Sequence, residues 1–286
     1  MKTFIVGFLI LLCTLSLPGQ TSMTNAVSAY SANRFNIQYG VADGHKLYLD
    51  AHVPKETGPF PILIIVHGGG WMTGDKEADI VPVLAPYATN FVWLTINYRL
   101  APANRWPACF DDVQTAIHWV KQHGAEYKGD PDHIALLGYS AGGHLVTLAG
   151  TLAAADVHVQ AIVGMAPPTD LVWDNERRGA LSKSMTSLFG YATTNITAHR
   201  RMVLRRYSPL TYVKPDLQPF LLVQGTADRT VPFRETTNFI AALQAATVPC
   251  DLLVITNGQH RIAEWTNYNP LWQERVVDWL NQKLKR

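Results

Sequence analysis

The sequence predicts an α/β fold in which helices cover both faces of a mostly parallel central sheet. Two observations carry this prediction. Short, continuous apolar runs rich in Val, Ile and Leu, such as residues 61–66 and 134–137, are typical of strands buried on both faces. Segments with apolar residues at helical spacing, such as residues 110–120, separate these runs. Strands that alternate with helices in this way form a parallel sheet through crossover connections.

The first ordered segment is expected to be an antiparallel hairpin at the edge of the sheet. Residues 34–39 and 46–52 alternate apolar and polar side chains, and Asp43-Gly44 between them is a typical turn pair. Further strands are expected at residues 91–96, 160–165, 220–223 and 252–255. Helices are expected at residues 78–87 and 143–149, and a further helix is expected to end at residue 245. A last helix is expected at the C-terminus, where Trp272, Val276, Trp279 and Leu280 face inward.

Residues 171–212 interrupt the alternation of strands and helices. This segment mixes charged, Ser/Thr-rich and short helical pieces. We interpret it as a small cap insertion that lies over the top of the sheet, within a single domain of residues 34–286. The basic run at residues 200–206 is expected to be a solvated helix face rather than a nucleic-acid patch.

Composition excludes several classes of protein. The chain has 286 residues, of which 48% are hydrophobic and 16% charged, which fits a globular fold with a large core. A formal net charge of +2 gives no reason to expect a nucleic-acid partner or an anionic membrane. Cys109 and Cys250 are predicted to be isolated thiols, and no pattern of Cys or His residues indicates zinc.

Residues 1–22 are predicted to be a secretory signal peptide, with cleavage as late as residue 29. Lys2 precedes an apolar run at residues 4–17, which Pro18-Gly19 interrupts. The run is shorter than the 18 or more residues typical of a membrane-spanning helix. We therefore expect a secreted or periplasmic protein without stable membrane insertion.

The candidate nucleophile is Ser140, within the stretch Gly-Tyr-Ser-Ala-Gly at residues 138–142. This stretch follows a predicted strand and precedes a predicted helix, which is the context of a nucleophile elbow. The turn leaves room only for very small residues on either side of the serine, and glycine tolerates its dihedral angles. The sequence therefore predicts that the hydroxyl of Ser140 is raised at the end of the sheet.

Two later strand ends supply the partners that a serine nucleophile needs. Asp228 follows the strand at residues 220–223, and His260 follows the strand at residues 252–255. The chain order of serine, acid and histidine is that of the α/β-hydrolase triad. His260 would accept the proton of Ser140, and Asp228 would orient the imidazole and stabilise its charged form. Asp251 precedes its strand and so lies at the wrong edge of the sheet.

A glycine loop at residues 67–70 provides candidate oxyanion donors. Acyl transfer places negative charge on the carbonyl oxygen, and backbone N–H groups must already point to it. We expect the donors to be Gly69 and Gly70 together with Ala141, which follows the nucleophile. Trp71 and Tyr139, which flank these groups, are the candidate substrate-binding residues, although Trp71 could equally be a packing residue.

Several motifs together resemble the α/β-hydrolase esterases of the hormone-sensitive-lipase and feruloyl/acetyl-xylan esterase-like groups. The motifs are His-Gly-Gly-Gly-Trp at residues 67–71, Asn-Tyr-Arg-Leu-Ala-Pro at residues 97–102, the elbow, and Ser-Pro-Leu at residues 208–210. The resemblance extends from about residue 34 to the end. It implies a carboxylic ester hydrolase without metal or organic cofactor. The chain departs from the pattern after His260, where Arg261-Ile262 stands in a region that is often aromatic.

Three hypotheses follow from these predictions. The favoured one is an exported serine esterase that acts through an acyl-enzyme on short-chain or aromatic acyl esters, which could be carbohydrate-linked. A formamidase, another amidase or a small peptidase would use the same triad. An inactive hydrolase fold that serves as a binding module is disfavoured, because all three triad residues stand at their expected places.

Overall fold

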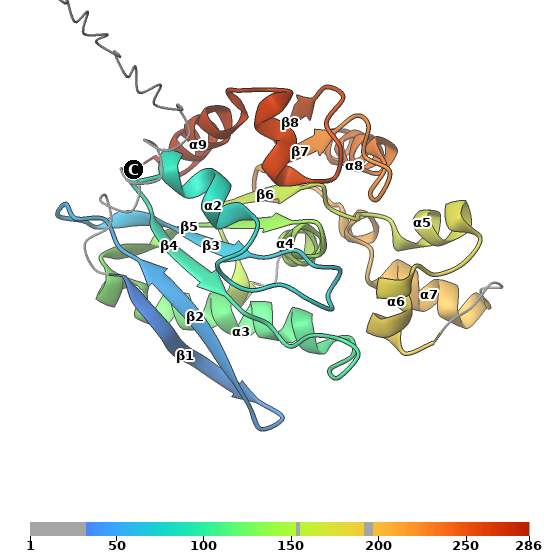
Figure 1. Cartoon of the computed structure of the whole chain (residues 1–286), viewed down its shortest axis with the longest axis horizontal. Helices are drawn as coiled ribbons and strands as arrows, with labels where there is room; N and C mark the ends of the chain where they lie inside the picture. Colours follow the sequence, from blue (N-terminus) through green and yellow to red (C-terminus); the bar gives the residue numbers. More distant parts are fainter. Residues whose placement is uncertain (1–32, 153–154, 192–196, 286) are drawn as a thin grey trace, which may run out of the picture.

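The computed structural model of the chain describes residues 33–152, 155–191 and 197–285. The predicted signal peptide, residues 1–22 or 1–29, lies outside this part of the chain. An eight-stranded sheet forms the centre of the molecule, with strand order β1-β2-β4-β3-β5-β6-β7-β8 (Figure 1). The strands are β1 (Arg34–Ala42), β2 (His45–His52), β3 (Phe60–Val66), β4 (Val92–Ile96), β5 (Gly129–Tyr139), β6 (Ala161–Met165), β7 (Phe220–Gly225) and β8 (Cys250–Ile255).

The sheet is parallel except at one edge. β1 and β2 form the expected antiparallel hairpin, and β2 also pairs antiparallel with β4. Asp43 and Gly44 form the turn, and both have positive φ angles, of 48° and 77°. These angles match a two-residue turn that follows the twist of the strands. From β4 to β8 every pair is parallel, so the prediction of a mostly parallel sheet is confirmed.

Helices cover both faces of the sheet. The helices outside residues 171–212 are α2 (Ile80–Leu84), α3 (Ala108–His123), α4 (Ala141–Leu152), α8 (Phe233–Ala245) and α9 (Trp272–Lys283). The apolar residues of α3, α4 and α8 belong to one hydrophobic cluster, and those of α2 and α9 belong to a second on the opposite face. Short 3-10 turns at Ala85–Tyr87, Gly124–Tyr127, Ala155–Val157 and Ile262–Asn267 complete the connections.

β5 shows why the buried strands have continuous apolar runs. Ile134 and Leu136 belong to the cluster on the α3 and α4 face, whereas Ala135 and Leu137 belong to the cluster on the α2 and α9 face. Successive side chains of a strand point to opposite faces, so both sets must be apolar when both faces are covered. β5 also starts earlier than expected, because the backbone at Gly129 pairs with Phe60 of β3.

The segment at residues 171–212 contains three short helices and a 3-10 turn. They are α5 (Leu171–Arg178), α6 (Lys183–Phe189), α7 (Ala198–Arg206) and η4 (Pro209–Tyr212). In Figure 1 the helices lie together beyond the ends of β5 and β6, away from the hairpin. The side chains of Asp170, Ser182 and Thr197 cap the three helices by accepting backbone N–H groups.

The two ends of this segment are joined to each other. The N–H of Leu171 donates to the hydroxyl oxygen of Ser208, and the N–H of Leu210 donates to the carbonyl of Thr169. The segment therefore leaves and rejoins the sheet at one place. Arg201, Arg205 and Arg206 of α7 are exposed, as expected for a solvated helix face. Within the described ranges, the structure contains no helix that is both long and apolar enough to cross a membrane.

Candidate active site

Ser140 lies in a sharp turn between β5 and α4. β5 ends at Tyr139 and α4 begins at Ala141, so one residue makes the change of direction. Ser140 has a φ angle of 53°, in the left-handed region, and its N–H donates to the carbonyl of Met165 over 2.8 Å. A Cβ atom at Gly142 would lie 2.1 Å from the carbonyl oxygen of Val66. The backbone packing thus explains the glycine and holds the strained serine in place.

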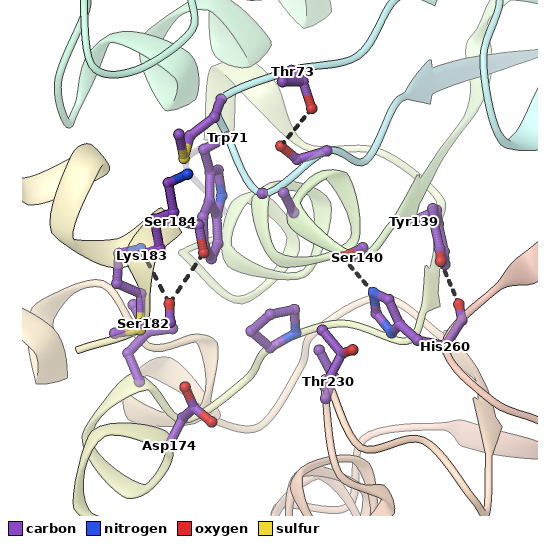
Figure 2. Close-up of a pocket in the computed structure, with 18 of the residues that line it drawn as sticks. Trp71, Thr73, Tyr139, Ser140, Asp174, Ser182, Lys183, Ser184, Thr230 and His260 are labelled. Atoms are coloured by element: carbon purple, nitrogen blue, oxygen red, sulfur yellow. Dashed lines mark hydrogen bonds between the residues drawn. The ribbon is translucent and has the colours of Figure 1, made fainter. Parts of the chain in front are cut away.

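The side chains of Ser140, His260 and Asp228 form a continuous hydrogen-bonded row. Ser140 Oγ lies 2.9 Å from His260 Nε2, and His260 Nδ1 lies 2.7 Å from Asp228 Oδ2 (Figure 2 shows the first contact). Because a carboxylate can only accept, Nδ1 carries the hydrogen and Nε2 presents its lone pair to the serine hydroxyl. In this tautomer His260 can take the proton of Ser140.

Asp228 is held rigidly from its other side. Its side chain is fully buried, and its Oδ1 accepts the N–H groups of Thr230 and Val231 over 2.8 and 2.9 Å. A buried carboxylate is costly unless donors surround it, and these two N–H groups are provided by the turn that follows β7. The predicted residues Ser140, Asp228 and His260 are therefore brought together by three separate strand ends.

The glycine loop lies beside Ser140. Gly69 and Gly70 have φ angles of 101° and 61°, and both line the same cavity as Ser140 and Ala141. Within the described ranges, none of the backbone hydrogen bonds that link turns and loops uses the N–H of Gly69, Gly70 or Ala141 as its donor. These three groups are free to donate to a substrate oxygen.

Buried contacts behind the loop fix its shape. The ring of His67 stacks on Tyr98 at 4.4 Å, and its Nδ1 lies 2.8 Å from the carbonyl oxygen of Gly68. Burial lowers the pKa of His67, which favours the neutral ring, and the stacked ring supports the loop. The carboxylate of Asp79 accepts the N–H of Gly68 over 2.9 Å. No motif marks Asp79 in the sequence, where it directly precedes a short helix.

The two candidate substrate-binding residues, Tyr139 and Trp71, face the cavity and also pack against its surroundings. Tyr139 and Trp71 both line the cavity, but they are only 7% and 4% exposed. The hydroxyl of Tyr139 donates to the backbone carbonyl of His260 (Figure 2). The indole of Trp71 packs edge-on against His144 at 5.3 Å. Each residue therefore supports the wall of the cavity as well as facing it.

The cavity above Ser140 has a volume of about 600 Å³. On one side lie Ser140, His260 and the glycine loop. On the other side lie residues of α5 and α6, including Asp174, Arg178 and Lys183, and Figure 2 shows Asp174 and Lys183 across the cavity from Ser140. Arg178 pairs with Asp174 over 2.8 Å. The predicted insertion thus provides a polar wall opposite the nucleophile.

A buried carboxyl group that the sequence did not indicate also lines the cavity. Glu235, in the first turn of α8, is 2% exposed. Its Oε2 accepts the N–H groups of Thr169 and Asp170 over 2.7 and 3.1 Å, where the chain enters the insertion. Burial raises the pKa of Glu235 to about 8, and the nearby carboxylate of Asp174 adds to this effect. No sequence motif distinguishes Glu235 from an ordinary acidic residue at a helix start.

Across the described ranges, no cluster of three or more His, Cys, Asp or Glu side chains has the arrangement of a metal site. Cys109 and Cys250 are free thiols.

Comparisons with known proteins show the family and the fold of the chain. Residues 49–243 match the family model BD-FAE. The chain is 34% identical over 248 residues to a probable carboxylic ester hydrolase, LipM, of Mycobacterium tuberculosis, covering 81% of this chain and 56% of LipM. It is 31% identical to the esterase LipC of the same organism, covering 74% of this chain and 55% of LipC. The chain thus spans about half the length of the curated relatives it matches.

Solved structures show the same fold. A truncated carbohydrate esterase from gut microbiota has a TM-score of 0.74 and 23% identity, covering 90% of this chain and 98% of that structure. An esterase of Thermogutta terrifontis has a TM-score of 0.71 and 22% identity, covering 90% of this chain and 93% of that structure. The expected α/β-hydrolase fold is confirmed.

Proposed function

Since the chain belongs to the BD-FAE family, we propose that it is a serine carboxylic ester hydrolase that works through an acyl-enzyme. The single observation that carries the proposal is the hydrogen-bonded row from Ser140 through His260 to Asp228 beside three free N–H groups. A nucleophile, a base, an orienting acid and oxyanion donors are the parts that acyl transfer needs. The ester-hydrolase names of its relatives support the same activity.

In the proposed first step, Ser140 Oγ attacks the carbonyl carbon of the ester while His260 Nε2 takes the hydroxyl proton. The carbonyl oxygen becomes an oxyanion and accepts the N–H groups of Gly69, Gly70 and Ala141. One such donor typically contributes roughly 3–4 kcal/mol to the stability of the transition state. Asp228 stabilises the imidazolium that forms.

The tetrahedral intermediate then collapses. The bond from the carbonyl carbon to the alcohol oxygen breaks, and His260 gives its proton to that oxygen, so the alcohol leaves and the acyl group stays on Ser140. Water then takes the place of Ser140 as the nucleophile, again with His260 as the base. It attacks the acyl carbon, its proton passes through His260 to Ser140 Oγ, and the carboxylic acid leaves.

The proposed substrates are esters of short-chain or aromatic acids, including carbohydrate-linked ones. A cavity of about 600 Å³ accommodates an acyl group of this size together with part of an alcohol. The polar wall formed by Asp174, Arg178 and Lys183 favours a leaving alcohol that carries hydroxyl groups. One similar structure is titled a carbohydrate esterase.

A panel of substrates tests this proposal. Nitrophenyl esters from acetate to octanoate, a feruloyl ester and an acetylated sugar are compared with the matching nitroanilide of acetate. We expect ester turnover with a burst of nitrophenol equal to the enzyme concentration, and no turnover by Ser140→Ala. Turnover of the anilide with none of the esters would instead favour an amidase, and turnover of neither would contradict the proposal.

Export forms a separate part of the proposal. Its support is the sequence of residues 1–22, with Lys2 before the apolar run at residues 4–17. Expression of the full chain with N-terminal sequencing of the extracellular or periplasmic fraction tests it. We expect a mature protein that starts between residues 23 and 30. A cytoplasmic product that retains Lys2 would contradict this part.

A further inference from the structure

Behind the carboxylate of Asp228 lie two buried polar side chains, Gln224 and Thr236. Gln224 is on β7, one residue before its end, and Thr236 is in the first turns of α8. Both are fully buried. Neither side chain lines the cavity, so neither can contact a substrate directly.

Gln224 is hydrogen-bonded to the same carboxylate oxygen that His260 uses. Its Nε2 donates to Asp228 Oδ2 over 3.0 Å and to the carbonyl of Val231 over 3.1 Å. Both of these partners can only accept, so the amide nitrogen must face them and the amide oxygen must face away. The orientation of the Gln224 amide is therefore fixed by its surroundings.

Thr236 completes the arrangement on the far side of the amide. Its hydroxyl lies 3.0 Å from Gln224 Oε1. Because that oxygen can only accept, the hydroxyl of Thr236 must donate. The hydrogen bonds therefore run in one direction, from Thr236 to Gln224 to Asp228, and the same Asp228 oxygen accepts Nδ1–H of His260.

We propose that Gln224 and Thr236 are positioning residues that extend the Ser140–His260–Asp228 row into the core and set the orientation and charge of the Asp228 carboxylate. This inference rests on the proposed function, because it assigns the two residues a role in that reaction. The Thr230 and Val231 N–H groups hold Oδ1, whereas Gln224 is the donor that shares Oδ2 with the imidazole. Loss of this donor would leave Oδ2 bonded to the imidazole alone, which weakens the orientation of the carboxylate and leaves more of its negative charge to the imidazolium.

Core packing alone is the competing explanation. Gln224 and Thr236 would then matter only for stability, like other buried polar side chains. Gln218 and Thr151 provide matched controls, because each is buried and hydrogen-bonded to a backbone carbonyl of α4 rather than to Asp228. The same substitutions at these positions remove a buried hydrogen bond without touching the row.

The experiment compares Gln224→Leu, Thr236→Val, Thr236→Ser and the double variant Gln224→Leu/Thr236→Val with Gln218→Leu and Thr151→Val. For Gln224→Leu we expect kcat to fall about 10- to 100-fold with KM unchanged, because the Asp228 carboxylate loses a donor that orients it toward His260. The acid limb of the kcat/KM–pH profile should move to higher pH, because the imidazolium is better stabilised by the less neutralised carboxylate.

Thr236→Val should lower kcat less, and Thr236→Ser, which keeps the hydroxyl, should restore it. The double variant should be no slower than Gln224→Leu, since Thr236 acts only through Gln224. The control variants should lose stability while keeping the wild-type kcat and pH profile. If Gln224→Leu does not fold, the Thr236 pair carries the test alone.

Two results separate failure of this inference from failure of the proposed function. A wild-type enzyme with no ester turnover would remove the proposed function and the inference with it. An active wild type whose Gln224→Leu and Thr236→Val variants keep the wild-type kcat and acid limb, or whose effects add independently, would overturn the inference and leave the proposed function intact.

Discussion

The two walls of the cavity differ in how they are built. On one wall, Ser140, His260 and the glycine loop follow strand ends, and hydrogen bonds to Met165, Asp228 and Asp79 hold them in place. The other wall comes from α5 and α6, where side-chain caps and ion pairs stabilise two short helices. The sheet therefore positions the proposed catalytic groups, whereas the insertion shapes the opposite side of the cavity.

The largest effect is expected on the sheet wall, for Asp228→Asn. An amide at this position would favour the tautomer of His260 that cannot accept the Ser140 proton, so kcat should fall about 10⁴-fold. Steady-state kinetics on a nitrophenyl ester measures this, and circular dichroism checks that the fold is kept. A variant with nearly wild-type kcat would mean that another group orients His260.

A smaller loss, in kcat/KM, is expected for Gly69→Ala. Gly69 has a φ of 101°, and an added Cβ would lie 2.0 Å from the carbonyl oxygen of Thr73. The loop must move, so we expect kcat/KM to fall roughly 10²- to 10³-fold, the loss typical of one oxyanion donor. Gly179→Ala is the matched control, because Gly179 also has a positive φ, of 71°, but open space around it. Equal losses in both variants would assign the effect to backbone strain alone.

On the insertion wall, Met185→Ala should change selectivity rather than chemistry. Met185 is 2% exposed and lines the cavity. Removal of its side chain enlarges the site, and each methylene of fit is worth about 1–3 kcal/mol. We expect the ratio of kcat/KM for long over short acyl esters to rise about 10-fold, while kcat for acetate stays near wild type. A matched loss of kcat for all esters would show that this wall also takes part in the chemistry.

The smallest effect on turnover is expected for Glu235→Gln, at the junction of the two walls. This substitution should instead change the free energy of unfolding. The pKa of Glu235 is about 8, against an ordinary value of 4.5. Between these values the folded state keeps a proton that the unfolded chain has lost, so the wild-type free energy of unfolding falls as pH rises from about 4.5 to 8. The glutamine stays neutral and avoids this loss.

Urea unfolding of wild type and Glu235→Gln at several pH values measures the difference. The free energy of unfolding of the variant, minus that of the wild type, should increase as pH rises through this window. The shift in pKa sets an upper bound of ~5 kcal/mol on the gain. Parallel curves for the two proteins would show that Glu235 ionises normally in the folded state.

Sequence patterns predicted the sheet wall better than the insertion wall, for a physical reason. Strands buried on both faces must be apolar throughout, and residues that follow them meet at one edge, so Ser140, Asp228 and His260 could be brought together from chain order alone. The limits of β5 were less predictable, because its first residues pair through their backbone and carry polar side chains.

Supporting residues were missed because their roles depend on how turns and neighbouring elements pack, which no sequence motif records. Gln224 reaches Asp228 across the turn that follows β7, and Thr236 reaches Gln224 through the packing of α8 against β7. Asp79 reaches the glycine loop from the start of α2. A polar residue within an apolar strand, as at Gln224, is the one signal that could have marked this site in advance.

The central claim is that Ser140 is a nucleophile activated by His260. Mass spectrometry of the protein after treatment with a fluorophosphonate tests it most directly. We expect one adduct on wild type, located on Ser140 by peptide mapping, none on Ser140→Ala, and much slower labelling of His260→Ala. No adduct on wild type, or an adduct that persists in Ser140→Ala, would contradict the claim.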